Sequence, residues 1–517
     1  VGYYALYSNT AGNNTALGYG AAYQNTTGTS NTALGYYSLQ SNTTASNNTA
    51  VGFKAGYTNT TGTSNSVFGK DAGYHVTTGS DNTYIGTASG PNLNPSTGSY
   101  NTALGRSALR ANTTANSNVA VGYQSLYLNT TGARNSVLGT NALDANTTGG
   151  NNVAIGFEAL TSNTTASSNT AVGYAAMHQN TTGASNTALG LNALYSNTTG
   201  LHHTAVGQSA LSTNTTGTYN TALGSFALQY TTTGYRNVGI GYGALRQNTV
   251  GFYNIGIGFG AGGLTTTGDY NTAVGSNAFI DNTTGNNNVA IGTDALANNT
   301  SASNSTAVGF QAGYSATTGG ANTFIGLLAG QHSVATTTGG TNTLVGAYVR
   351  VTAAAGDAAN GLGYNIACQG GYTTLGNGTS DIRAAHGNVT WSTVSDERYK
   401  KDITDATAGL SFINDLTPRT FKYRNLGELP DTFESYKEGS TDVFKNSYTN
   451  HGFIAQEVKA AIDAHPEIKD GFTLWDDRED GSQEVAEAAL IPVLVKALQE
   501  LSAKNDALEA RIATLEG

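Results

Sequence analysis

A 17-residue repeat constrains this chain more than any other feature. Residues 14–18, 31–35 and 48–52 align as Asn-Thr-Ala-Leu/Val-Gly, and the pattern continues at this period, with one exception, through residues 322–326. A fixed period of this length predicts a solenoid, in which every repeat forms one coil that stacks on its neighbours. We therefore expect residues 1–346 to form one repetitive shaft.

The composition of each repeat, counted from its Asn as the first position, favours strands over helices. The fourth position is always apolar, the fifth is always Gly, and the eighth is nearly always Ala or Ser. Short apolar stretches bounded by Asn-Thr-Thr-Gly turns predict β-strands separated by tight turns. The expected fold is mainly β, a parallel β-solenoid or β-roll, and the apolar positions should supply the few buried side chains of each coil.

Coils that bury so few side chains are thin, and this bears on oligomeric state. A thin coil buries more apolar surface when three copies pack around a shared axis, which predicts a homotrimer. A self-sufficient monomeric solenoid is the alternative.

Charge divides the chain at one junction. Nine of the 23 Lys and Arg and nine of the 33 Asp and Glu precede residue 395, so the remaining 14 and 24 fall in residues 395–517 and carry the whole net charge of -10. We expect a β connector or cap at 347–394, where the repeat decays, and a separate domain at 395–517. Without a basic patch, nucleic acid is not an expected partner.

Several classes of protein are disfavoured by what the chain contains. Cys368 is the only cysteine, so no intrachain disulfide can form. Cys368 and His386 lack further ligands at metal spacing, so neither a metal site nor a cofactor is predicted. The chain contains no run of 18 apolar residues, so no membrane span is predicted. Val1 falls within a repeat and is not a start methionine, so we expect a further N-terminal region that could attach the chain to other proteins.

Aromatic residues recur on the shaft and support two interpretations. Tyr or Phe often occupies the sixth position, as in Tyr19, Tyr36 and Phe53. Exposed Tyr beside Asn and Thr suits a receptor glycan, whereas stacking between coils would make the same residues a structural ladder. Longer repeats between Asn82 and Asn101 and between Asn322 and Asn342 are either binding loops or neutral changes of length.

A serine five residues before a lysine lies at the junction. A neutral Lys400 amine could take the proton of the Ser395 hydroxyl as its oxygen attacks a carbonyl, provided that burial and a nearby cation lower the amine pKa. The two side chains must also meet, which the spacing alone does not guarantee.

The last segment, about 491–517, carries an apolar heptad seam typical of a coiled coil. Its spacing leaves two or three strands open. The seam residues are Ile491, Leu494, Leu498, Leu501, Asn505, Leu508, Ile512 and Leu515.

Residues 395–517 resemble the C-terminal intramolecular chaperone domain of phage endosialidase tailspikes. The resemblance lies in residues 395–403 (SDERYKKDI), 416–423 (LTPRTFKY), 451–458 (HGFIAQEV) and 490–500 (LIPVLVKALQE). It implies a trimer and one self-cleavage between Val394 and Ser395, with Ser395 as nucleophile and Lys400 as general base. Asp396, Arg398 and His451 match motif positions without an assigned catalytic role.

The shaft repeats are similar to those of the trimeric β-roll heads of bacterial autotransporter adhesins, and related repeats occur in phage tail fibres. Together the resemblances imply a tail fibre or tailspike, made in the cytoplasm of the bacterial host, carried on the virion and bound to a host glycan or protein receptor. Other virion tail proteins would bind its N-terminal side.

Two further functions compete with a tail fibre. One is a bacterial surface adhesin or extracellular fibre that carries the same chaperone. The other is a polysaccharide depolymerase, which needs paired carboxylates. Carboxylates are sparse on the shaft, where Glu158 is the only Glu, so turnover enzyme activity is not expected there.

Overall fold

The computed structural model describes residues 2–93, 95–331, 335–388, 391–393, 395–433, 435–469, 472–477 and 481–516. The chain divides into two compact units, Val1–Val394 and Ser395–Gly517. Each unit is described by itself below. Among the described residues no helix is long and apolar enough to cross a membrane.

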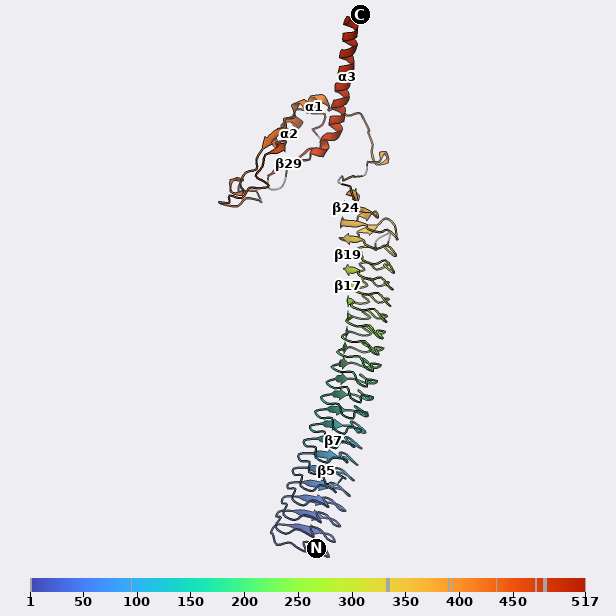
Figure 1. Cartoon of the computed structure of the whole chain (residues 1–517), viewed down its shortest axis with the longest axis vertical. Helices are drawn as coiled ribbons and strands as arrows, with labels where there is room; N and C mark the ends of the chain where they lie inside the picture. The colour runs from blue at the N-terminus through green and yellow to red at the C-terminus, as the bar shows by residue number, and fades with distance from the viewer. Residues whose placement is uncertain are drawn as a thin grey trace. The chain divides into compact units, whose positions relative to one another are not determined.

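The first unit is a parallel β-solenoid, as the repeat predicts (Figure 1). Each repeat contributes one strand of three residues, and consecutive strands pair in parallel and in register, with Ala16 opposite Ala33 and Ala33 opposite Ala50. In the described part of the repeats the strands are β1 (Thr15–Leu17), β2 (Thr32–Leu34), β3 (Thr49–Val51), β4 (Ser66–Phe68), β5 (Thr83–Ile85), β6 (Thr102–Leu104), β7 (Val119–Val121), β8 (Ser136–Leu138), β9 (Val153–Ile155), β10 (Thr170–Val172), β11 (Thr187–Leu189), β12 (Thr204–Val206), β13 (Thr221–Leu223), β14 (Val238–Ile240), β15 (Ile255–Ile257), β16 (Thr272–Val274), β17 (Val289–Ile291), β18 (Thr306–Val308), β19 (Thr323–Ile325) and β20 (Thr343–Val345).

The core of each coil is not where the fourth-position residues suggest. Successive side chains of a strand point to opposite faces. The third-position Ala16 and Ala33 are buried, whereas Leu17 is 53% exposed and Leu138 51%. The expectation that the apolar positions supply the buried side chains therefore fails at the fourth position. The core instead combines the third position with Ala or Ser at the eighth and often Leu at the ninth, such as Leu109 and Leu126.

Two ladders of buried asparagine run along the solenoid. At the first position, Asn31 N–H donates to Asn14 Oδ1 at 2.9 Å, and Asn48 N–H donates to Asn31 Oδ1 at 3.0 Å. At the twelfth position, Asn42 Nδ2 donates to Asn25 Oδ1 at 2.6 Å. Buried polar groups are costly unless they are hydrogen-bonded, and in these pairs a neighbouring coil supplies the partner. The twelfth-position ladder is interrupted, because Asn59 and Asn112, among others, each keep a buried Oδ1 without a hydrogen bond. This explains why Asn recurs at fixed positions inside an apolar coil.

The invariant fifth-position glycine allows neighbouring coils to approach closely. Gly35 has a φ of 141°, and a Cβ placed on it would lie 2.3 Å from the carbonyl oxygen of Gly52. No side chain fits that space, and the backbone conformation also favours Gly.

Each of the two longer repeats has an aromatic residue in the core of its coil. Tyr84 and Phe324 occupy the third position in these two repeats and are fully buried, whereas other repeats have Ala, Gly, Val or Leu there. The ninth-position Gly90 and Gly330 make room, since a Cβ on either would lie 2.6 Å from the ring. Residues 94 and 332–334 of the longer repeats lie outside the described residues. The longer repeats therefore have a packing role that neither a binding loop nor neutral length change anticipates.

The parallel ladder continues into residues 347–394. Strand β22 (Asn360–Tyr364) pairs with β20 and with β24 (Tyr372–Asn377), and β21 (Arg350–Val351) pairs with β23 (Ala367–Cys368). Strand β25 (Ser380–Ala385) then pairs antiparallel with β24. Burial raises the pKa of the Cys368 thiol to about 11, so this thiol is unreactive at neutral pH.

The second unit is a small α+β domain that ends in a 27-residue helix, as predicted. Its core joins Phe412 of α1, Val458 and Ile462 of α2, and Leu490 and Val493 of α3. The elements are η1 (Glu397–Tyr399), α1 (Leu410–Asp415), β26 (Arg419–Phe421), η2 (Leu426–Glu428), β27 (Asn450–Gly452), α2 (Ala455–Asp463), β28 (Trp475–Asp477), β29 (Gln483–Val485), η3 (Glu487–Ala489) and α3 (Leu490–Glu516).

One buried histidine, His203, predicts a pH dependence of the stability of the shaft. His203 replaces Asn in the first-position ladder, where its Nδ1 accepts a hydrogen bond from Asn220 N–H at 3.2 Å and its Nε2 lies 2.7 Å from Gly217 O. This arrangement fits the neutral ring with its proton on Nε2. Burial lowers the His203 pKa to about 4. Below pH 6.5 the unfolded chain takes up a proton that the folded chain does not, so folding loses stability as pH falls from 6.5 to 4.

We predict that His203→Asn removes this loss. A shift of this size corresponds to about 3 kcal/mol in the free energy of unfolding per chain. Thermal unfolding at pH 7.5 and pH 4.5 should show a smaller acid-induced decrease in Tm for His203→Asn than for wild type. His202→Asn, at the neighbouring position, is the control. Equal pH dependence in wild type and His203→Asn would contradict the assignment.

Candidate active site

The first residues of the second unit form one tight turn. Asp396 caps η1: its Oδ1 accepts hydrogen bonds from Arg398 N–H and Nε, both at 2.9 Å, and its Oδ2 accepts one from Arg398 Nη2 at 2.6 Å. Lys400 N–H closes the turn by donating to Glu397 O at 2.9 Å. Asp is a favoured N-cap because its carboxylate satisfies an otherwise unpaired backbone N–H.

This turn brings Ser395 and Lys400 together. The Lys400 Nζ donates a hydrogen bond to Ser395 Oγ at 2.7 Å. Asp396 and Lys400, on either side of η1, have extended backbones, so the helical turn is confined to the three residues Glu397–Tyr399. A nucleophile and a base within hydrogen-bonding distance meet the first geometric requirement for an activated serine.

The pair is exposed in the single chain. A lysine acts as a base only when its amine is neutral, and burial is the usual means of favouring the neutral form. Two cations lie close to Lys400 in sequence, Lys401 and Arg398. Arg398 is engaged by Asp396, and the hydrogen bonds from Arg398 hold the pKa of that carboxyl below its usual range. The geometry of the pair is therefore present, and a dry environment would have to come from a surface that covers it.

The other residues predicted at the site are not in contact with the pair or lie outside the described residues, apart from Asp396 and Arg398. Val394, on the far side of the predicted scissile bond, lies outside the described residues. His451 lies in β27, where it pairs with Thr420 of β26, and the described residues show no hydrogen bond between His451 and Ser395 or Lys400. Asp396 and Arg398, which match motif positions without an assigned catalytic role, form the cap and the ion pair of the turn. An Asp at the start of a short polar turn is an N-cap signal that could have revealed Asp396.

The heptad residues lie on α3. The buried side chains of this helix, Leu490, Val493 and Ala497, all lie in its first turns. Leu498 is 65% exposed and Leu515 83%. The Asn505 side chain donates to Glu509 Oε1 at 3.0 Å on the same helix. The unit therefore presents an apolar seam that its own core does not cover, formed by Ile491, Leu494, Leu498, Leu501, Leu508, Ile512 and Leu515.

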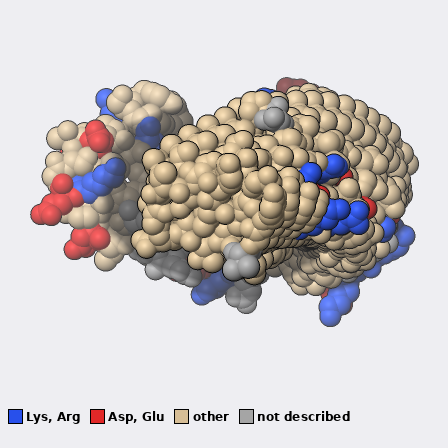
Figure 2. Space-filling model, turned by 90° about the horizontal axis from the view of Figure 1, so that it is seen from below, with Lys and Arg blue, Asp and Glu red and all other residues tan. Residues whose placement is uncertain are grey.

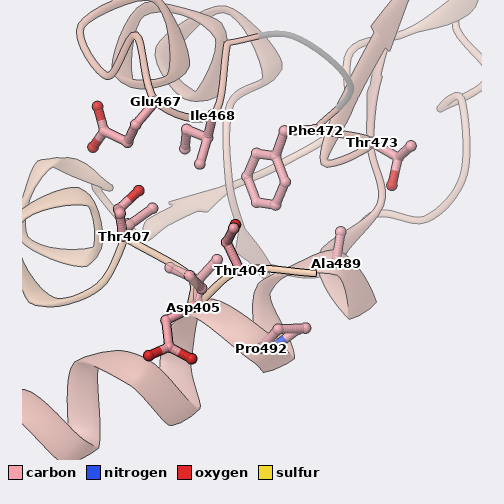
Figure 3. Close-up of a pocket in the computed structure, with 12 residues that line it drawn as sticks. Thr404, Asp405, Thr407, Glu467, Ile468, Phe472, Thr473, Ala489 and Pro492 are labelled. Carbon is pink, nitrogen blue, oxygen red and sulfur yellow. The ribbon is translucent and has the colours of Figure 1, made fainter. Parts of the chain in front are cut away.

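An open cavity of about 530 Å³ lies elsewhere in the second unit. Its lining comes from residues 404–408, from Glu467, Ile468, Phe472 and Thr473, and from the start of α3. Figure 3 shows the Phe472 ring pointing toward Thr404, while the Asp405 carboxyl points away from the ring. Neither Ser395 nor Lys400 lines this cavity, so it is separate from the serine–lysine pair.

Sixth-position aromatic residues of the shaft form stacked ladders. The rings of Tyr19 and Tyr36 lie 5.5 Å apart, and those of Tyr36 and Phe53 lie 5.4 Å apart, with nearly parallel planes. Phe157 and Tyr174 stack in the same way. Because stacking places the ring faces against one another, mainly ring edges are left for a ligand.

Comparison with known proteins gives one match, which covers the first part of the second unit. Residues 395–465 match the sequence model of the family described as the chaperone of endosialidase. The match starts at Ser395 and includes the capped turn. Searches of curated proteins and of solved structures found no match to the chain.

The cap generates a graded prediction for self-cleavage. Asp396→Ala removes both the cap and the ion pair, Asp396→Asn keeps an oxygen that can accept from Arg398 N–H, and Arg398→Ala removes only the ion pair. We expect Asp396→Ala to slow cleavage several-fold and Asp396→Asn to restore most of the rate. Rates are measured from the appearance of the cut product across pH 6 to 9.

Arg398→Ala tests the ion pair, which is exposed and should contribute little. Its rate is expected to stay close to that of wild type. Equal rates for Asp396→Ala and Asp396→Asn would show that the cap does not position the pair.

Proposed function

We propose that this chain is a homotrimeric fibre protein for attachment to a host surface, a phage tail fibre or tailspike, whose second unit directs assembly and then releases itself. The observation that carries this proposal is the 2.7 Å hydrogen bond between Lys400 Nζ and Ser395 Oγ. It lies at the first residue of the match to the chaperone family, directly after the unit that contains the solenoid.

The chemistry is one peptide-bond cleavage per chain. Lys400 takes the hydroxyl proton of Ser395 as Oγ bonds to the carbonyl carbon of Val394. The carbon–nitrogen bond then breaks, the nitrogen of Ser395 takes up the proton, and an ester is left. Water hydrolyses the ester, which frees the Val394 carboxylate and restores the Ser395 hydroxyl.

The repeat explains why such a fibre needs an assembly unit. Every coil repeats the same strand, ladder and turn, so chains offset by 17 residues meet nearly the same contacts. A coiled coil that forms first would fix the number of chains and their register. Once the shafts have folded, release of the second unit leaves them held by their own packing, which makes unfolding slow.

Attachment is proposed for the shaft. Its surface carries Asn, Thr and Tyr with few charges, which suits a neutral glycan or a protein receptor. The fibre would be carried on the virion after synthesis in the cytoplasm of the bacterial host, with other tail proteins bound on its N-terminal side.

Self-cleavage is tested with Ser395→Ala and Lys400→Ala. Both variants should remain full length and still trimerise, because cleavage follows assembly. Wild type should show two fragments on a denaturing gel. Lys401→Ala, one residue away, is the matched control and should be cut like wild type.

A wild-type chain that trimerises and stays full length would contradict the assignment of the pair. Cleavage that persists in Ser395→Ala would assign the nucleophile elsewhere.

The helix seam gives a separate prediction. Leu498→Lys with Leu501→Lys places charges on the apolar seam of α3 and should prevent assembly of newly made chains, measured as soluble trimer by analytical ultracentrifugation. Gln499→Lys with Asp506→Lys places the same charges on the opposite, exposed side of the helix, away from the seam and its flanking heptad positions, and should assemble normally. Equal yields of trimer from both pairs would argue against a coiled coil.

A further inference from the structure

The side of the solenoid strands that faces solvent is unusually apolar. The outer strand face is defined as the side chains at the second and fourth positions of β1–β20, which point away from the core because the third position points into it. The second position is mostly Thr, and the fourth is always Leu, Val, Ile or Phe. Fourth-position residues with more than a third of their surface exposed include Leu17, Phe68, Ile85, Leu104, Leu138, Ile155, Leu189, Leu223, Ile257, Ile291 and Ile325.

No charged residue occupies the outer strand face. The charged residues of the repeats, such as Lys54, Asp71 and Arg134, occupy other positions of the coil. In the view of Figure 2, most of the visible surface likewise carries no charged side chain. An uncharged apolar strip on a parallel sheet is the kind of surface that another sheet covers, at a spacing of about 10 Å.

The strip is too large for a typical free surface. If each fourth-position side chain exposes roughly 25–50 Å² of apolar area, some twenty coils expose about 500–1,000 Å². The largest apolar patch on a typical monomer is about 300–600 Å². A stable interface buries about 800 Å² on each partner. The strip alone therefore approaches the area that a lasting interface requires.

The spacing of the strip indicates what covers it. Apolar residues recur once per coil, and the longer repeats do not disturb them, since Ile85 pairs in register with Leu104 and Ile325 with Val345. A short peptide or a compact protein would cover only a few coils. A second copy of this chain offers the same residues at the same spacing over the same length.

We propose that the outer strand faces of neighbouring copies pack against one another and form the interface that holds the shafts together after the second unit has been released. This inference rests on the proposed homotrimer and names the surface through which its shafts meet. It also assigns the regular spacing of apolar residues at the fourth position to assembly between chains.

The test compares two double variants of the full chain. Leu189→Lys with Leu223→Lys places two charges on the outer strand face. Thr199→Lys with Thr216→Lys places two charges on exposed fourteenth-position residues of the same shaft region and is the matched control. Circular dichroism checks that both chains fold, and analytical ultracentrifugation measures the mass of the shaft after self-cleavage.

We expect trimeric shafts for wild type and for the Thr199 and Thr216 control. We expect the Leu189 and Leu223 variant to dissociate at protein concentrations that are roughly tenfold or more higher than those at which wild type dissociates. A Leu189 and Leu223 variant that stays trimeric like its control, or a wild-type shaft that is monomeric after release, would overturn the interface.

Failure of the proposed function is distinguishable from failure of this interface. If wild type is not cut, the same masses are measured after a specific protease has cut a recognition sequence inserted between Val394 and Ser395, so that chains assembled with an intact α3 lose the second unit and only the shaft can hold copies together. Trimers that the Leu189 and Leu223 changes abolish would then support the interface without self-cleavage. Monomeric shafts in the chain that keeps Leu189 and Leu223 would overturn the interface.

Discussion

The in-register stacking of identical coils is the constraint on which the rest of the structure depends. Each strand has only three residues, so its stability comes from the coils above and below it. Asn ladders pair many of the buried polar groups between coils, and Gly35 and its equivalents allow the backbones to approach closely. None of these contacts exists within a single repeat, which is why the shaft forms only as an array.

The same regularity creates a difficulty for assembly. A sheet whose successive strands are nearly identical does not distinguish one register from another 17 residues away. Local features break the repetition, such as Tyr84, His203 and Phe324, but they are far apart along the shaft. A separate element that aligns the chains therefore has a physical purpose, and a capped turn with Ser395 and Lys400 in contact at its start offers a means of removing that element afterwards.

The period predicts the solenoid and its strands because coil stacking follows from a fixed repeat. It does not tell which apolar position is buried, because Ala16 and Leu17 are both apolar. The volume of the side chain decides which position is buried, since the thin coil accepts Ala. It accepts Tyr84 or Phe324 only where glycines make room. Likewise, the resemblance to the chaperone domain indicates Ser395 and Lys400 but not their contact, which is made across the turn that Asp396 caps. The seam of α3 is visible from its heptads, whereas its exposure depends on where the core of the second unit ends.

The central claim is that one bond, between Val394 and Ser395, separates a lasting shaft from a temporary assembly unit. Intact-mass spectrometry of the purified wild-type protein tests it most directly. Two species are expected from each chain, one that ends at Val394 and one that begins at Ser395. A single species at the full-length mass of 53.0 kDa from assembled protein, or a cut at another bond, would contradict it.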